Sequence, residues 1–183
     1  MNKGVAYTGI PSEQELRNSP GYPKPEDFEK GPIAVIECVQ EIPCNPCETA
    51  CRQGAIVVGE PITNLPCFDA DKCTGCGLCV ASCPGQAIFV VHLHYSDEES
   101  LVSFPFEYLP LPQVGDQANA INRAGEVMCR GQVVKIQTPR AFDRTAVITI
   151  AIPKAFAHRV RGIERPRRIR QGQQGGLSSL KKM

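Results

Sequence analysis

The chain has 183 residues, enough for one medium domain or two small ones, and its formal net charge at pH 7 is +1. Its ten cysteines are far more than an ordinary cytosolic protein carries, and a disulfide scaffold would require an oxidising compartment. The first residues contain no apolar signal-peptide core, and no apolar stretch reaches the length of a membrane span. We therefore expect a cytoplasmic protein without membrane association, whose thiols bind metal.

Residues 1–31 read as an extended N-terminal arm that contains several prolines and few large apolar residues. Ser12 followed by Glu15 forms a capping-box pattern, which predicts the start of one short helix. The remainder of the arm has no core of its own, so we expect it to be ordered by lying on another surface.

Residues 32–93 contain an internal repeat with an offset of 32 residues. Three cysteines of each copy match, as do the apolar runs before and after them: Cys44, Cys47 and Cys51 with Cys76, Cys79 and Cys83, Ile33–Ile36 with Leu65–Phe68, and Ala55–Val58 with Ala87–Val90. Each copy reads as strand, cysteine loop, short helix and strand, with helices expected at Asn45–Cys51 and Gly77–Cys83. Neither copy can bury its apolar face alone, so the two are expected to share one core.

The second copy contains the run CTGCGLCVASCP from Cys73 to Pro84. Its C-x2-C-x2-C-x3-C-P spacing is typical of bacterial iron–sulfur sites, in which the fourth cysteine ligates the other cluster. The crossed pattern predicts one complete site, cluster A, with the ligands Cys73, Cys76, Cys79 and Cys51. Structural zinc is disfavoured, because zinc sites usually join two C-x2-C pairs across an intervening segment.

The same rule predicts a second site, cluster B, with Cys44, Cys47, Cys83 and one further ligand. Three residues are candidates for that ligand. Cys38 lies on the loop that enters the first motif, and we favour it. Cys67 aligns with a strand position and is expected to pack as a small buried hydrophobe. Glu41 stands where the repeat would place a cysteine, but a carboxylate is a hard ligand that suits a thiolate-held cluster poorly.

Residues 94–157 read as a small β extension, an antiparallel sheet or barrel. From the end of the repeat onward, apolar alternation predicts four strands, at Ile88–Tyr95, Leu101–Tyr108, Glu126–Gln137 and Thr145–Ile152. Cys129 is expected to be a core thiol, and His92 and His94 to share a half-exposed strand face. No nucleotide-binding or nucleophile motif is present in the sequence, so we expect no catalytic residue on this chain.

Residues 158–183 form an expected basic tail with eight Lys/Arg and one acid, a net charge of +7 against −6 for residues 1–157. Basic tails bind phosphate backbones, which raises a nucleic-acid function as one hypothesis. No aromatic residue interleaves with these arginines, as single-strand binding would favour. We therefore favour docking on an acidic partner surface and expect no nucleic-acid partner.

With cysteines and glycines placed in this way, residues 32–93 resemble the bacterial two-cluster 4Fe–4S ferredoxins. The resemblance implies an α+β, ferredoxin-like domain of two related halves with two 4Fe–4S clusters. Two positions depart from that pattern: Arg52 replaces the usual proline after Cys51, and Glu41 replaces the leading cysteine. A positive charge at Arg52 would tend to raise the potential of cluster A.

The phrase AVIECVQEIPCNPCETACRQGAI, the later KCTGCGLCVASCPGQAI and the β extension are together similar to a narrower group. This group is the 4Fe–4S subunits of multi-subunit FAD-dependent dehydrogenases of proline, hydroxyproline or opine-type amino acids. The resemblance implies a non-catalytic electron-transfer subunit of a hetero-oligomer, with FAD on flavoprotein partners and a 2Fe–2S subunit as a further candidate partner. The alternative is a free ferredoxin carrier, but the arm, sheet and tail are sequence that a bare carrier does not need.

Overall fold

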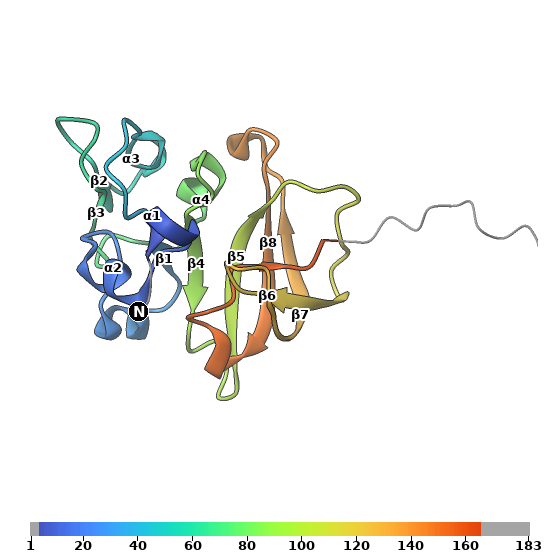
Figure 1. Cartoon of the computed structure of the whole chain (residues 1–183). Coiled ribbons are helices and arrows are strands. Elements are labelled where there is room, and N and C mark those ends of the chain that lie inside the picture. Colours follow the sequence, from blue (N-terminus) through green and yellow to red (C-terminus); the bar gives the residue numbers. More distant parts are fainter. Residues whose placement is uncertain (1–3, 166–183) are drawn as a thin grey trace, which may run out of the picture.

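A computed structural model describes residues 4–165 of the chain, and its central feature is one antiparallel sheet of seven strands (Figure 1). The strand order is β1-β4-β5-β8-β7-β6-β9. The strands of this sheet are β1 (Ile33–Ile36), β4 (Ile88–His92), β5 (Glu99–Phe106), β6 (Gln117–Ile121), β7 (Val127–Gln137), β8 (Ala146–Pro153) and β9 (Gly162–Ile163). The mixed α/β content with a large antiparallel sheet agrees with the predicted class.

Seven short helices and a second, two-stranded sheet complete the described part of the chain. The helices are α1 (Val5–Thr8), α2 (Glu13–Asn18), η1 (Pro25–Lys30), α3 (Pro46–Ala50), α4 (Leu78–Ser82), η2 (Arg140–Phe142) and η3 (Lys154–Phe156), where η denotes a 3-10 helix. The small sheet pairs β2 (Ile56–Val57) with β3 (Cys67–Phe68).

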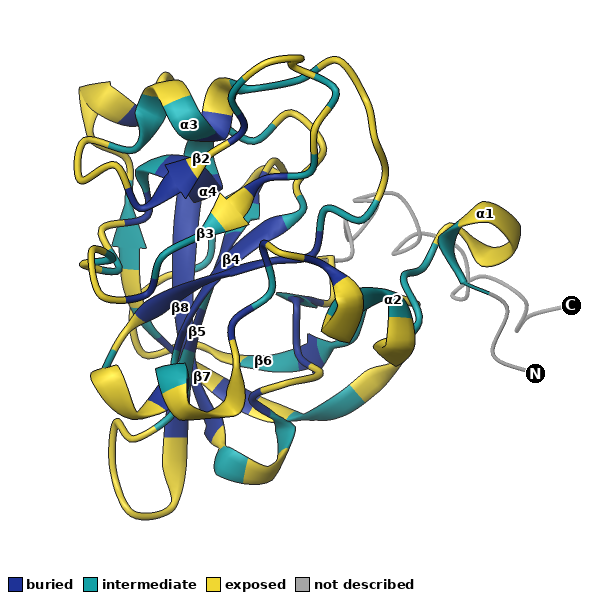
Figure 2. Ribbon diagram, turned by 90° about the vertical axis from the view of Figure 1, so that its left-hand side faces the viewer, coloured by how far each residue is buried: buried dark blue, intermediate teal, exposed yellow. Residues whose placement is uncertain are grey.

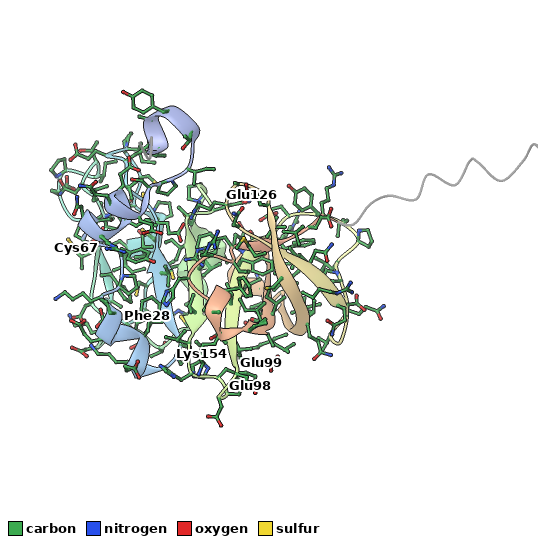
Figure 3. The ribbon with its side chains drawn as sticks, turned by 60° about the horizontal axis from the view of Figure 1, so that its bottom comes forward. Phe28, Cys67, Glu98, Glu99, Glu126 and Lys154 are labelled. Atoms are coloured by element: carbon green, nitrogen blue, oxygen red, sulfur yellow. The ribbon has the colours of Figure 1, made fainter. Side chains whose placement is uncertain are left out.

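The later part of the N-terminal arm lies against the first part of the sheet, because η1 contacts β1 and the Ser19 hydroxyl donates to the Cys38 carbonyl. The expectation of an extended arm with one short helix is wrong, since α1 and η1 are helical in addition to α2. The capping box is confirmed, because the Ser12 hydroxyl accepts from the Glu15 amide while the Glu15 carboxylate accepts from the Ser12 amide at 2.7 Å. Further along, Phe28 on η1 is 3% exposed (Figure 3). It belongs to the main core, the cluster of buried side chains that also includes Val35, Phe89, Phe104 and Ile150. This aromatic side chain anchors the arm through the hydrophobic effect.

The two repeat halves fold around each other. β1 from the first half pairs with β4 from the second, with Ile36 opposite Ile88, while β2 and β3 form the smaller ladder. Helices α3 and α4 contact each other. Pro46 is the first residue of α3, a position where a missing N–H costs nothing.

The β extension continues the ferredoxin-like sheet without a break. β4 pairs with β5 through Val91 and Val102, so the connection between the parts expected at 32–93 and 94–157 joins two paired strands. Figure 2 shows β8 buried along nearly its whole length and β6 less covered. The far end of the sheet curls, because β9 pairs with β6 and also lies against β5.

The first residues of the expected basic tail belong to this packed body. Residues 158–165 include β9, and Arg161 among them is only 8% exposed. The cause is an ion pair with Glu37, a contact between residues 124 positions apart that no local pattern could indicate. The rest of the expected tail, 166–183, lies outside the described residues.

Candidate metal centre

Four cysteines from both repeat halves surround one pocket, here called pocket A. The thiols are Cys51 at the end of α3 and Cys73, Cys76 and Cys79 on the loop and helix of α4. The remainder of the wall is mostly apolar and includes Ala34, Ile56 and Val90. The empty space of the pocket, counted together with its opening to solvent, is about 340 Å³. These four residues are the set expected for cluster A.

A glycine makes the tight loop of pocket A feasible. Gly75 has φ +64°, and a Cβ at this position would lie 2.6 Å from the Pro32 carbonyl oxygen. Any side chain would therefore combine backbone strain with a collision against the chain entering β1. The close approach sets the path of the loop between Cys73 and Cys76.

A second pocket, here called pocket B, lies on the same face of the sheet, and its empty space, counted together with its opening to solvent, is about 380 Å³. Its wall contains four thiols, again from both halves: Cys38, Cys44, Cys47 and Cys83. Ile36 and Ile88 close it toward the sheet. Cys38 therefore lies where a fourth ligand is expected, while neither Cys67 nor Glu41 lines the pocket.

Backbone amides point at three of the sulfurs. The Ala55 amide donates to Cys51 Sγ at 3.2 Å, and the Ala34 amide donates to Cys73 Sγ at 3.4 Å. The Ala87 amide donates to Cys83 Sγ at 3.4 Å. Such bonds favour thiolate over thiol and are one of the means by which proteins set cluster potentials.

Sequence reasoning missed these donors, although the repeat contains a signal for two of them. Ala55 and Ala87 each lie four residues after a cysteine, at the same place in the repeat. The donor Ala34 had no such signal, because β1 approaches Cys73 only in the folded chain, 39 residues away.

Crowding shapes the electrostatics of both pockets. Burial raises the pKa of Cys79 far above its usual range, and the neighbouring thiols of pocket A raise it further. Burial and then the nearby Cys83 raise the pKa of Cys47 to about 11. Burial likewise raises the pKa of Cys38. Four thiolates can share such a space only if positive metal charge compensates them, so the donor set suits a bound metal group.

The thiols of each set line a space rather than converge on a point. In residues 4–165 no group of three or more His, Cys, Asp or Glu side chains gathers as a single metal ion would need. A cage with four iron corners requires separated thiolates, and the residues of both pockets fit such a group.

The remaining sequence-based candidates lie elsewhere. Cys67 was expected to be buried, and this is wrong: it is exposed on β3, at the outer edge of the molecule (Figure 3). Cys129 is half-buried and packs against the main core, as expected. β4 ends at His92, so His94 leaves the expected strand face and meets Glu29 instead, at 3.0 Å.

The fold and the pockets define an iron–sulfur site of the ferredoxin type. Residues 66–89 match the family described as the 4Fe-4S binding domain. This segment contains the whole second cysteine motif, all of β3 and the first part of β4. The chain therefore contains a 4Fe–4S ferredoxin-type domain that binds an iron–sulfur cluster.

Curated relatives match parts of the chain. A subunit of the ion-translocating oxidoreductase complex of Methanosarcina acetivorans is 49% identical over 47 residues, covering 26% of this chain and 17% of the relative. The Ferredoxin-type protein NapF of Escherichia coli is 35% identical over 57 residues, covering 30% of this chain and 35% of the relative. Protein Pixie of Drosophila melanogaster is 27% identical over 106 residues, covering 49% of this chain and 17% of the relative.

The chain thus spans between 17% and 35% of the length of these relatives. No solved structure matches the chain. Within residues 4–165, no helix combines the length and the apolar character that crossing a bilayer requires.

Proposed function

We propose that this chain is an electron-transfer subunit with two 4Fe–4S clusters, which relays single electrons between a flavin-containing partner and a further acceptor. Cluster A would be held by Cys51, Cys73, Cys76 and Cys79. Cluster B would be held by Cys38, Cys44, Cys47 and Cys83. The observation that supports this proposal most directly is that two pockets are each lined by four thiols, with one thiol of each set supplied by the other repeat half.

When bound, each such group accepts and releases one electron at a time. The chain's own residues provide the insulation and the proximity that a relay needs. Cys47 and Cys79 are both buried in one apolar core, on the two helices that contact each other. The thiol of Cys47 also contributes to the raised pKa of Cys79, which supports two neighbouring sites.

Both pockets have a route to partners. Cys76 of pocket A is exposed, and Ile42, which lines pocket B, is 46% exposed. A redox partner that docks at either end would therefore approach a ligand or a wall residue of the site directly. A relay needs two accessible sites, one where an electron enters and one where it leaves, whereas a storage site needs only one.

The proposed partners are flavoprotein subunits of an amino-acid or amine dehydrogenase that carry FAD, with a 2Fe–2S subunit as a further member of a cytoplasmic hetero-oligomer. Two observations support a subunit. Phrases of the sequence resemble such subunits, and the name of the matched Methanosarcina acetivorans relative describes a subunit of an oxidoreductase complex. The chain itself would perform no acid–base or nucleophilic step.

Anaerobic purification of the native assembly tests this proposal. We expect a flavoprotein to copurify, and we expect an amino acid such as proline to bleach the visible absorbance of the clusters. A single species near the chain mass of 19.9 kDa, without flavin, would instead identify a free carrier. A colourless preparation containing zinc would exclude both.

A further inference from the structure

A buried ion cluster lies directly behind pocket B. Glu37, which follows the last residue of β1, is 5% exposed. Its Oε2 accepts from Arg123 Nε, and its Oε1 accepts from Arg161 Nε. Burial strengthens such charged hydrogen bonds, because less water competes for the same groups.

Three distant segments meet in this cluster. Arg161 is held firmly, since its guanidinium also donates to the carbonyl oxygens of residues 157, 158 and 160. Arg123 comes from the turn between β6 and β7. Both guanidinium carbons lie over the Phe89 ring, at 5.0 Å for Arg123 and 5.2 Å for Arg161.

The cluster carries an excess positive charge. Two guanidiniums share one carboxylate, which leaves a net charge of one in a largely buried place. Arg123 Nη2 is in addition buried without a hydrogen-bond partner among the described residues. A single arginine would be enough to neutralise Glu37, so the second arginine leaves a charge that the carboxylate does not balance.

The position of this charge relative to pocket B follows from the alternation of side chains along a strand. Ile36 and Ile88 are paired and both line pocket B. The next residues, Glu37 and Phe89, therefore point to the opposite face of the same two strands. The ion cluster and pocket B are separated by the backbone of the sheet, with no bulk water between them.

We propose that Arg123 and Arg161, held in place by Glu37, are positioning residues whose excess positive charge raises the reduction potential of the group held by pocket B. This inference rests on the proposed second cluster. A cubane held by four thiolates is anionic and becomes more so on reduction, so a fixed positive charge across a low-dielectric sheet favours the reduced state. Glu37 directly precedes the expected ligand Cys38, but among the described residues none of the three side chains forms a hydrogen bond with a ligand thiol. Their charges therefore act on the group in pocket B through the electrostatic field.

Paired variants of the full chain separate this charge effect from loosened packing. Arg123→Met removes the excess positive charge, whereas Glu37→Gln removes the negative charge and increases the excess. Both break the same ion pair. Anaerobic potentiometric titration with EPR should show a lower midpoint potential for one couple in Arg123→Met and a higher one in Glu37→Gln. Arg123→Lys should restore the wild-type value.

Arg130→Met is the matched control, because this exposed arginine on β7 carries the same charge away from the ion cluster. It should move neither couple, and a Cys38→Ala variant identifies which couple belongs to pocket B. Shifts in the same direction for Arg123→Met and Glu37→Gln, no shift, or loss of a cluster would overturn the proposal. If Glu37→Gln does not fold, the comparison of Arg123→Met with Arg123→Lys tests the charge effect instead. Equal midpoint potentials of the pocket B couple in these two variants would contradict the proposal. The iron content of the wild type, measured first, tests the second cluster separately.

Discussion

At the scale of single residues, the fourth ligand of cluster B gives a direct test. Cys38 lines pocket B, whereas Cys67 lies exposed on β3. Cys38→Ala should lower the iron content of anaerobically prepared protein from about eight per chain, while Cys67→Ala should leave it unchanged. Iron analysis with visible spectroscopy measures both. The reverse pattern would assign the ligand to Cys67.

Gly75 offers a second test, which concerns pocket A. Gly75→Ala would place a Cβ against the Pro32 carbonyl in a left-handed backbone conformation, at a cost of about 1–3 kcal/mol for the strain alone. We expect a lower thermal midpoint and loss of the cluster in pocket A. Gly85→Ala is the control, because nothing lies within 4 Å of its added Cβ. Equal behaviour of the two variants would contradict this role of Gly75.

The residue scale also shows what the sequence could predict. The spacing of the cysteines is a local property, and the two thiol sets expected from it line the two pockets. The burial of Arg161 is a long-range property. The composition of residues 158–183 indicated a basic tail that docks on a partner, whereas Arg161 pairs within the chain with Glu37, 124 residues away. The prediction that Cys67 is buried was wrong for a related reason, because its strand β3 pairs only with the short β2 and stays exposed.

At the scale of elements, η1 fastens the N-terminal arm through one aromatic side chain. Phe28→Ala should lower the free energy of unfolding by about 3–5 kcal/mol, because it opens a cavity in the core. Urea unfolding of cluster-loaded protein measures the change. Tyr7→Ala, on the 80% exposed Tyr7 of α1, should change stability by less than about 0.5 kcal/mol. An equally small effect of Phe28→Ala would mean that the arm is held by other contacts.

The contact between η1 and the segment after η3 should depend on pH. The His158 ring packs edge-on against the Phe28 ring, with 4.7 Å between the two ring centroids. Burial lowers the pKa of His158, and the nearby positive charge of Arg161 lowers it further. The folded state therefore disfavours the protonated imidazole, so unfolding takes up a proton. Stability should decline as the pH falls below about 6.5, the ordinary value of an unfolded histidine.

This dependence is measured by urea unfolding between pH 7.5 and 5.5, within the range where the iron content stays constant. His158→Gln removes the titrating group and should flatten the profile relative to the wild type. A wild-type protein that gains stability on acidification through this range, or a variant with an unchanged slope, would contradict the assignment.

Elements differed in how well the sequence indicated them. The α2 helix was predicted because a capping box is a local hydrogen-bond pattern. The β6 and β9 strands were missed: β6 mixes Gln117 and Asn119 with alanines, and β9 has two residues. Both are strands because β6 has a partner on each side, Cys129 of β7 opposite Ala120 and Gly162 of β9 opposite Ile121.

At the scale of the whole molecule, the ferredoxin-like part and the β extension share their structure. The main core contains Val35 and Phe89 from the first and Phe104 and Ile150 from the second. The core beneath the pockets likewise includes Phe142 and Val147. Because each core draws side chains from both parts, the extension supports the cluster domain as well as enlarging it.

Truncation should therefore disable the iron site even though it removes none of the eight expected ligands. A chain that ends at residue 93 would expose the edge of β4 and uncover Val91, which β5 and the main core bury in the whole protein. We expect this fragment to aggregate or to retain little iron after anaerobic reconstitution. A chain that ends at residue 165 keeps every described contact and should retain its full iron content. Iron analysis after gel filtration compares the two, and a monomeric, brown 1–93 fragment would show that the ferredoxin-like part folds alone.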